Sequence, residues 1–173
     1  MTDLHYLPAT EALRRFRSHE LSPVELLDAV IARAEAVDTT VNALCHTFYD
    51  QAREQAREAE SRYMGKGEPA RPLEGIPTAV KEEEAVAGQP WTQGSLIYKD
   101  LVADHSSCFA QRILDSGAIV HARATAPEFS CAGFTHPATM SSTWSSGTPT
   151  RSHAATIVRP SRSSVRMCDS EPP

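Results

Sequence analysis

The sequence predicts an α/β fold, in which helices pack on a β-sheet, and three observations support this prediction. Apolar residues recur at helical spacing through the first third of the chain. A short β-like run, interrupted by glycine and proline, follows at residues 73–81. Further on, a helix, a glycine and an apolar strand occur in the order expected of one unit of an α/β sheet.

Two helices are predicted at the start of the chain. Residues 8–18 form a short helical candidate. The second helix has a stronger start signal, because Ser22 supplies an N-cap hydroxyl, Pro23 occupies the first helical position and Glu25 follows three residues after the cap. Its apolar residues predict one buried face through about residue 37, formed by Leu27, Val30, Ile31, Ala34 and Val37.

The middle of the chain predicts one ambiguous segment and one clear helix. Residues 41–48 fit either a strand or an extended connector, with Val41, Leu44 and Phe48 as core candidates. The charged stretch over 51–60 predicts a helix whose Arg and Glu residues form a solvated surface. Its buried face would be made of small residues and one aromatic residue: Ala52, Ala56, Ala59 and Tyr63.

The last predicted elements lie between residues 107 and 122. Residues 107–116 form a helix that ends at Gly117, and residues 118–122 form a buried strand. From residue 140 onward neither a strand nor a helical period persists, so we expect that segment to be mostly disordered. Three residues of the helix are expected to face inward: Phe109, Ile113 and Leu114.

Composition excludes several functional classes. A chain of 173 residues fits one domain with a real core. The net charge of -5 argues against an electrostatic nucleic-acid binder. No apolar stretch approaches the ~20 residues that cross a bilayer, and the N-terminus lacks the features of a secretory signal. We therefore expect a cytoplasmic protein that binds neither membrane nor nucleic acid and keeps its scattered cysteines reduced.

Four blocks of the sequence, in correct order and spacing, resemble the amidase-signature family. The blocks are Pro72–Lys81, Val86–Ser95, Asp115–Val120 and Arg123–Phe129. The segments 21–27 and 41–44 are similar to the opening of the family domain, so the resemblance covers roughly residues 4 to 136. It implies an N-terminal portion of the family fold, with helices packed on an incomplete mixed β-sheet. We expect this part to occupy residues 1–137 and an irregular, non-family tail to occupy 138–173.

The resemblance also implies a chemistry. Family members cleave amides with a nucleophilic serine, a second serine on a cis peptide and a lysine, and the position of that lysine corresponds to Lys81. A lysine acts as a base only when its ammonium is destabilised, and we expect burial against Ile76, Ala79 and Val80 to do so. The alternative is an exposed Lys81 paired with the glutamates of 82–84. The block around Pro127 would be a structural turn with Phe129 packed inward.

Two departures from the family pattern bear on activity. Glu82 stands where the family has aspartate, and its longer side chain could shift a structural hydrogen bond. The family's glycine- and serine-rich loop is missing after His136, and the nearest match, Ser145-Ser146-Gly147, is interpreted as ordinary loop hydroxyls.

The sequence leaves two functional hypotheses open. The first is an amidase-family hydrolase of carbon–nitrogen bonds that acts on a small-molecule amide through a Ser-cisSer-Lys mechanism without a cofactor, here truncated and inactive as an isolated chain. Whether such an enzyme is a free amidase or part of a tRNA-dependent transamidation complex is left open. The second is a non-catalytic fragment, either a frameshift product or a partner-binding remnant. It would expose apolar faces on the helix and strand of residues 107–122 and self-associate through an exposed sheet edge.

Metal binding is not expected. His105 with Cys108, and Cys131 with His136, are isolated pairs that fall short of a zinc site.

Overall fold

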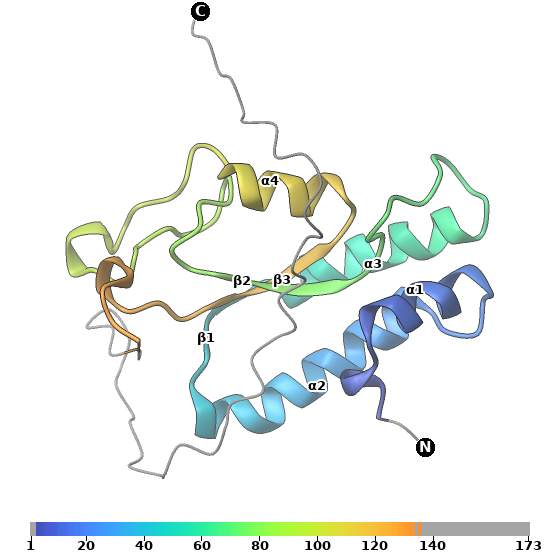
Figure 1. Ribbon diagram of the computed structural model, residues 1–173, viewed down its shortest axis with the longest axis horizontal. Helices are drawn as coiled ribbons and strands as arrows, with labels where there is room; N and C mark the ends of the chain where they lie inside the picture. The colour runs from blue at the N-terminus through green and yellow to red at the C-terminus, as the bar shows by residue number, and fades with distance from the viewer. Residues whose placement is uncertain (1–2, 134, 136–173) are drawn as a thin grey trace, which may run out of the picture. The chain divides into compact units, whose positions relative to one another are not determined.

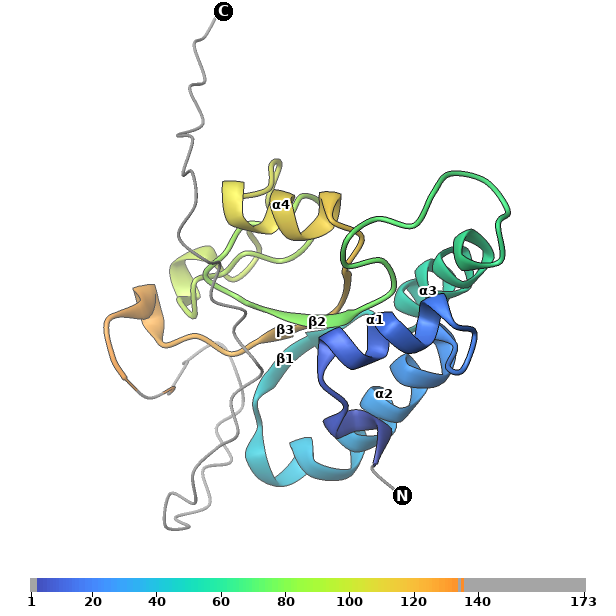
Figure 2. The ribbon, with the colours of Figure 1, turned by 45° about the vertical axis from the view of Figure 1, so that its right-hand side comes forward.

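A computed structural model describes residues 3–133 and 135. Within them, helices surround a small sheet (Figure 1, Figure 2). The elements are η1 (Leu4–Tyr6), α1 (Ala9–Arg17), α2 (Pro23–Val41), β1 (Leu44–Thr47), α3 (Tyr49–Tyr63), β2 (Pro77–Lys81), η2 (Leu96–Tyr98), α4 (Cys108–Asp115), β3 (Ile119–Ala124) and η3 (Glu128–Ser130). None of the described helices is long and apolar enough to span a bilayer. The tail predicted over 138–173 lies outside the described residues.

The sheet is mixed, as predicted, and β3 is its central strand. The strand order is β1-β3-β2, with β1 antiparallel and β2 parallel to β3. The first five residues of β3 are buried, which is typical of a strand that is covered on both faces. Figure 1 shows α2 and α4 on opposite sides of this sheet. The parallel β2–β3 pair therefore forms the centre of the described part.

The start of α2 has the capping box that the sequence predicts. The Ser22 hydroxyl accepts a hydrogen bond from the N–H of Val24 at 3.0 Å, and the Glu25 carboxylate accepts one from the N–H of Ser22 at 2.9 Å. Pro23 is the first helical residue. The N–H groups of Ser22 and Val24, which a helix start leaves without intrahelical partners, are satisfied in this way, and Pro23 has no N–H to satisfy.

The ambiguous segment 41–48 contains a strand, and α2 runs a full turn beyond its predicted end near residue 37. Asn42 ends the helix in the left-handed region with φ of 51°, and Asp38 Oδ1 accepts hydrogen bonds from the next two N–H groups at 2.7 and 3.1 Å. The chain then enters β1. Val41 is 59% exposed on the last helical turn, so its placement in the core was wrong.

Apolar side chains cover both faces of β3. On one face, Ile119 packs with residues of α2 and α3, and on the other Val120 packs with Val80 and with Ala110 of α4. The small buried residues predicted for α3, Ala52, Ala56 and Ala59, all lie inside. Phe109 was expected to face inward but is 56% exposed, because α4 turns Ala110 and Leu114 toward the sheet instead. The helix is too short for the spacing of its apolar residues to show which of its sides faces the sheet.

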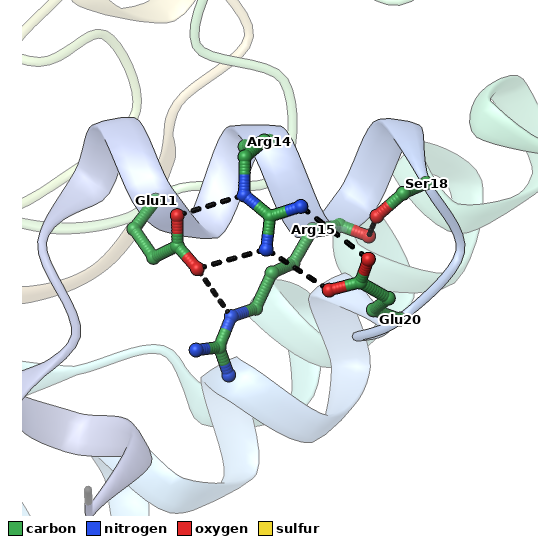
Figure 3. Close-up of polar contacts among 5 residues, drawn as sticks. All are labelled: Glu11, Arg14, Arg15, Ser18 and Glu20. Carbon is green, nitrogen blue, oxygen red and sulfur yellow. Dashed lines mark hydrogen bonds and ion pairs between the residues drawn. The ribbon is translucent and has the colours of Figure 1, made fainter.

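The polar contacts of α1 form a surface network (Figure 3). Arg14 bridges the carboxylates of Glu11 and Glu20 at 2.9 and 3.0 Å, and Arg15 contacts Glu11 at 2.7 Å. The hydrogen bond from Arg14 is the main reason that the pKa of Glu11 is lowered to about 2. Exposed pairs of this kind contribute little to stability, so we interpret the network as a solvated helix surface.

Unfolding should become easier as the pH falls, because His121 is buried in its neutral form. Its ring is 5% exposed, stacks on Tyr49 at 6.4 Å between centroids, and has a pKa lowered by burial from 6.5 to about 4. Between pH 6.5 and about 4 the unfolded chain binds a proton on His121 that the folded chain does not bind. The free energy of unfolding therefore has its full value above pH 6.5 and decreases as the pH falls toward 4. The loss is on the order of 3 kcal/mol.

Urea unfolding at pH 7.5 and pH 5 measures this effect. We expect His121→Gln to reduce the difference between the two free energies of unfolding, whereas His19→Asn, at an exposed histidine with φ of 58°, leaves it intact. An unchanged pH dependence in His121→Gln would contradict the assignment.

Candidate active site

Lys81 is the last residue of β2, at the carboxyl end of the parallel pair. It lies opposite Ala124, the last residue of β3. Carboxyl ends of parallel strands meet at one edge of a sheet, so the loops that follow β2 and β3 converge there. Residues 82–95 and 125–131 build the surroundings of Lys81.

The Lys81 amine lies at the surface of this edge. Its Nζ is 3.0 Å from Glu83 Oε1 and 3.4 Å from the hydroxyl of Ser130, which itself donates to the Glu83 carboxylate. The side chain of Lys81 is 43% exposed, so the expected burial was wrong. The reason is the alternation of the strand, because Val80 turns into the apolar cluster under α4 and its neighbour Lys81 turns the other way.

The three glutamates after Lys81 lie in three different environments. Glu83 pairs with Lys81, as the alternative interpretation of the sequence expected of a neighbouring glutamate. Glu84 accepts a hydrogen bond from the Ser107 hydroxyl that caps α4. Glu82 is 2% exposed and does not contact the amine. The negative charge that the sequence concentrates here is therefore distributed in space.

Glu82 fixes the loop that runs past the site. Its carboxylate accepts hydrogen bonds from the backbone N–H groups of Thr92, Gln93 and Gly94, the last two at 3.1 Å. A buried carboxylate is stable only when its lone pairs are satisfied, and three N–H donors provide this. The residue that departs from the family's aspartate thus makes a structural hydrogen-bond set with this loop.

The same loop is joined to the segment after β3. Ser95 is fully buried and donates to Glu128 Oε1 at 2.8 Å, and the N–H of Phe129 donates to the Gln93 carbonyl at 2.9 Å. Gly94 has φ of +65°, and a Cβ there would lie 2.7 Å from the Ala126 carbonyl oxygen. The two loops are therefore in direct backbone contact, and glycine is required at the point of closest approach.

The segment around Pro127 forms a 3-10 turn, but the expected inward packing of Phe129 was wrong. Phe129 is 48% exposed, and its ring meets the edge of Tyr98 at 6.0 Å. The turn is held by Glu128 through Ser95 rather than by the aromatic side chain.

Arg123 is a site component that reasoning from the sequence missed. It lies on β3 with 0% exposure and donates to the carbonyls of Lys81, Glu82 and Glu84. Burial lowers the pKa of its guanidinium. An arginine inside a mostly apolar strand was the available signal, because a buried cation needs partners.

Three other predicted candidates lie outside the described residues. Ser145 and Ser146 lie outside them, as does His136. Among residues 3–133 and 135, no group of three or more His, Cys, Asp and Glu side chains is arranged to hold a metal ion.

Comparison with known proteins identifies the family. The family model described as Amidase matches residues 25–152, and the chain therefore belongs to the amidase-signature family of hydrolases. It is 34% identical to Amidase FG08078 of Gibberella zeae over 70% of this chain and 22% of that protein. It is 40% identical to a glutamyl-tRNA(Gln) amidotransferase subunit of Deinococcus deserti over 70% of this chain and 24% of the relative.

Solved structures agree with the sequence comparison. A bacterial aryl acylamidase of the amidase-signature family matches 73% of this chain with a TM-score of 0.67 and 30% identity, using 26% of its own length. The observed elements are thus part of the amidase-signature fold. The chain spans about a quarter of the length of these relatives.

Replacing Glu82 with glutamine should destabilise the loop over residues 92–94. An amide offers one acceptor oxygen where the carboxylate has two, so at least one buried N–H loses its partner, at a cost of about 1–3 kcal/mol. Chemical denaturation measures this loss, and amide exchange of residues 92–94 should accelerate. Glu68→Gln, in an exposed loop, is the matched control and should change neither quantity. Equal stabilities of the two variants would refute this role of Glu82.

Proposed function

We propose that this chain contributes the lysine-bearing part of a site that hydrolyses the carbon–nitrogen bond of a small-molecule carboxamide. In this proposal a serine attacks the carbonyl carbon, a second serine on a cis peptide relays the proton, and Lys81 is the base, with no cofactor. Family membership supports the reaction class. The position of Lys81 at the carboxyl end of the β2–β3 pair is the observation that carries the assignment of its role.

The isolated chain is proposed to be inactive. It holds the lysine but lacks the glycine- and serine-rich loop, and Ser145-Ser146-Gly147 offers only one glycine in its place. The chain also spans about a quarter of the relatives' length. The Lys81 amine is also engaged by the Glu83 carboxylate at 3.0 Å, a partner that a hydrolytic Ser-cisSer-Lys site does not use. We propose that the chain is a truncated segment of an amidase and that it is cytoplasmic. A frameshift in a longer gene is one origin of such a segment.

A chimeric enzyme tests the reaction and the role of Lys81 together. Residues 25–133 of this chain would replace the matching segment of the acylamidase of Rhodococcus erythropolis, a relative with 33% identity over 73% of this chain. We expect the chimera to hydrolyse its amide substrate and Lys81→Ala to lower kcat about 10²–10⁴-fold, the usual range for loss of a general base. The 173-residue chain alone should not react with a fluorophosphonate probe.

The matched control is Lys99→Ala, which removes an exposed lysine beside Asp100 and should leave the chimera active. If the chimera with Lys81→Ala keeps its full rate, Lys81 is not the base. Probe labelling of the unmodified chain would overturn the proposed inactivity.

A second candidate function is that of a partner-binding remnant that associates through the open edge of β2. Within the described residues, β2 pairs with β3 on one side only. The carbonyl of Ile76 and the N–H of Glu82 both bond toward β3, so alternation directs the N–H of Ala79 to the free edge. An unpaired edge of this kind can add a strand from a second copy of the chain.

Sedimentation velocity across a concentration series tests this association. Ala79→Pro removes the outward N–H and should weaken dimer formation about tenfold or more. Gly133→Ala is the matched control, because nothing lies within 4 Å of the added Cβ and the backbone of Gly133 is outside the left-handed region. A chain that stays monomeric at every concentration would exclude the edge as an association surface.

A further inference from the structure

Arg123 donates hydrogen bonds to the backbone carbonyls of the turn that follows β2. Its Nη2 donates to the carbonyl oxygens of Lys81 at 3.2 Å and Glu82 at 3.3 Å, and also to that of Glu84. Its Nη1 donates to Gln89 Oε1 at 3.1 Å. The N–H of Glu84 closes the same turn by donating to the Lys81 carbonyl at 3.0 Å. One side chain on the central strand thus holds both the end of β2 and the chain beyond it.

Fold stability alone is a weak explanation for this arginine. Burying a cation costs several kcal/mol. A protein with an apolar residue of similar volume at such a position is often as stable or more stable. The Nε of Arg123 is also buried and has no hydrogen-bond partner in the described part of the chain, which adds a further cost. The planar fork of a guanidinium offers donors in fixed directions, which a flexible lysine ammonium does not.

The charged groups near Arg123 act on different parts of the site. The buried Glu82 carboxylate partly compensates the guanidinium charge and holds residues 92–94. Glu84 contributes its carbonyl to Arg123 while its carboxylate faces Ser107. Glu83, between them, is left to pair with the Lys81 amine. The orientation of this turn therefore decides which carboxylate faces the lysine.

We propose that Arg123 is a positioning residue for Lys81, fixing the backbone of residues 81–84 so that the lysine amine and the Glu83 carboxylate face each other. The proposal rests on the proposed function for the catalytic meaning of Lys81. The geometric part concerns the folded chain and holds whether or not the chain takes part in hydrolysis.

Competitive acylation of the lysines tests this role without any substrate. The chain has three lysines, Lys66, Lys81 and Lys99, so the other two are internal references. Acetic anhydride labelling at pH 7.5, read by peptide mass spectrometry, gives the rate at Lys81 relative to Lys66. In Arg123→Lys the turn loosens and the Glu83 pair is lost, so we expect this ratio to rise roughly two- to fivefold, the range for losing one partly exposed ion pair.

Arg71→Lys is the matched control. Arg71 is a partly buried arginine that holds Glu74 at 2.6 Å and reaches the Leu114 carbonyl, away from Lys81. A purely structural role of Arg123 predicts the same labelling ratio in both variants, and that result overturns the proposal. A rise confined to Arg123→Lys supports it.

A second variant keeps the test decisive if Arg123→Lys does not fold. Gln89→Ala removes one partner of the guanidinium and leaves the carbonyl contacts. We expect the Lys81-to-Lys66 labelling ratio to rise less than in Arg123→Lys. Amide exchange should accelerate more at Glu84 than in β1. Unchanged labelling and exchange in the folded Gln89→Ala protein would count against the proposal. If the chimeric amidase fails to hydrolyse its substrate, the lysine labelling and the amide exchange can still be measured. The role of Arg123 and the proposed function can therefore be refuted separately.

Discussion

The parallel pairing of β2 with β3 is the constraint on which the rest of the described structure depends. It places the ends of the two strands side by side, with Lys81 opposite Ala124, so that the loops after them must pack on each other. Two buried charges then fix the loop after β2: Glu82 holds the backbone N–H groups of residues 92–94, and Arg123 holds the backbone carbonyls of residues 81, 82 and 84. Each ion is satisfied mainly by peptide dipoles, which fixes the backbone more directly than a contact between two side chains would.

Much of the fold could be predicted because its signals are local. The capping box at Ser22 depends on residues within one helical turn, and the small buried face of α3 follows from its spacing. Rotation of short elements was less predictable, since Phe109 and Ala110 are adjacent and packing against Val80 and Val120 decides which of them faces the sheet. That choice depends on contacts far apart in sequence, which periodicity does not contain.

In the candidate site, too, the local features were predictable and the contacts between distant residues were not. The position of Lys81 at the end of a strand was predictable from its motif, but the partners of the following glutamates were not. Three identical residues in a row face a lysine amine, a set of backbone N–H groups and a helix-capping serine. Composition treats them as one block of negative charge. Their separate directions arise because the turn held by Arg123 reverses the chain within these few residues.

The exposure of Lys81 follows from its place on the edge strand of the described sheet. The described residues carry the helices, the three strands and the loops that hold the lysine, and each cluster of the core is closed by residues within this segment. The surface above Lys81 is formed by Ser130, Glu83 and solvent, because the described segment has no further strand beside β2. A base becomes effective only when water and competing carboxylates are excluded from it. A segment that folds around its own core can therefore preserve the position of the lysine that we propose as the base, while the access of water to its amine depends on what covers this edge of the sheet.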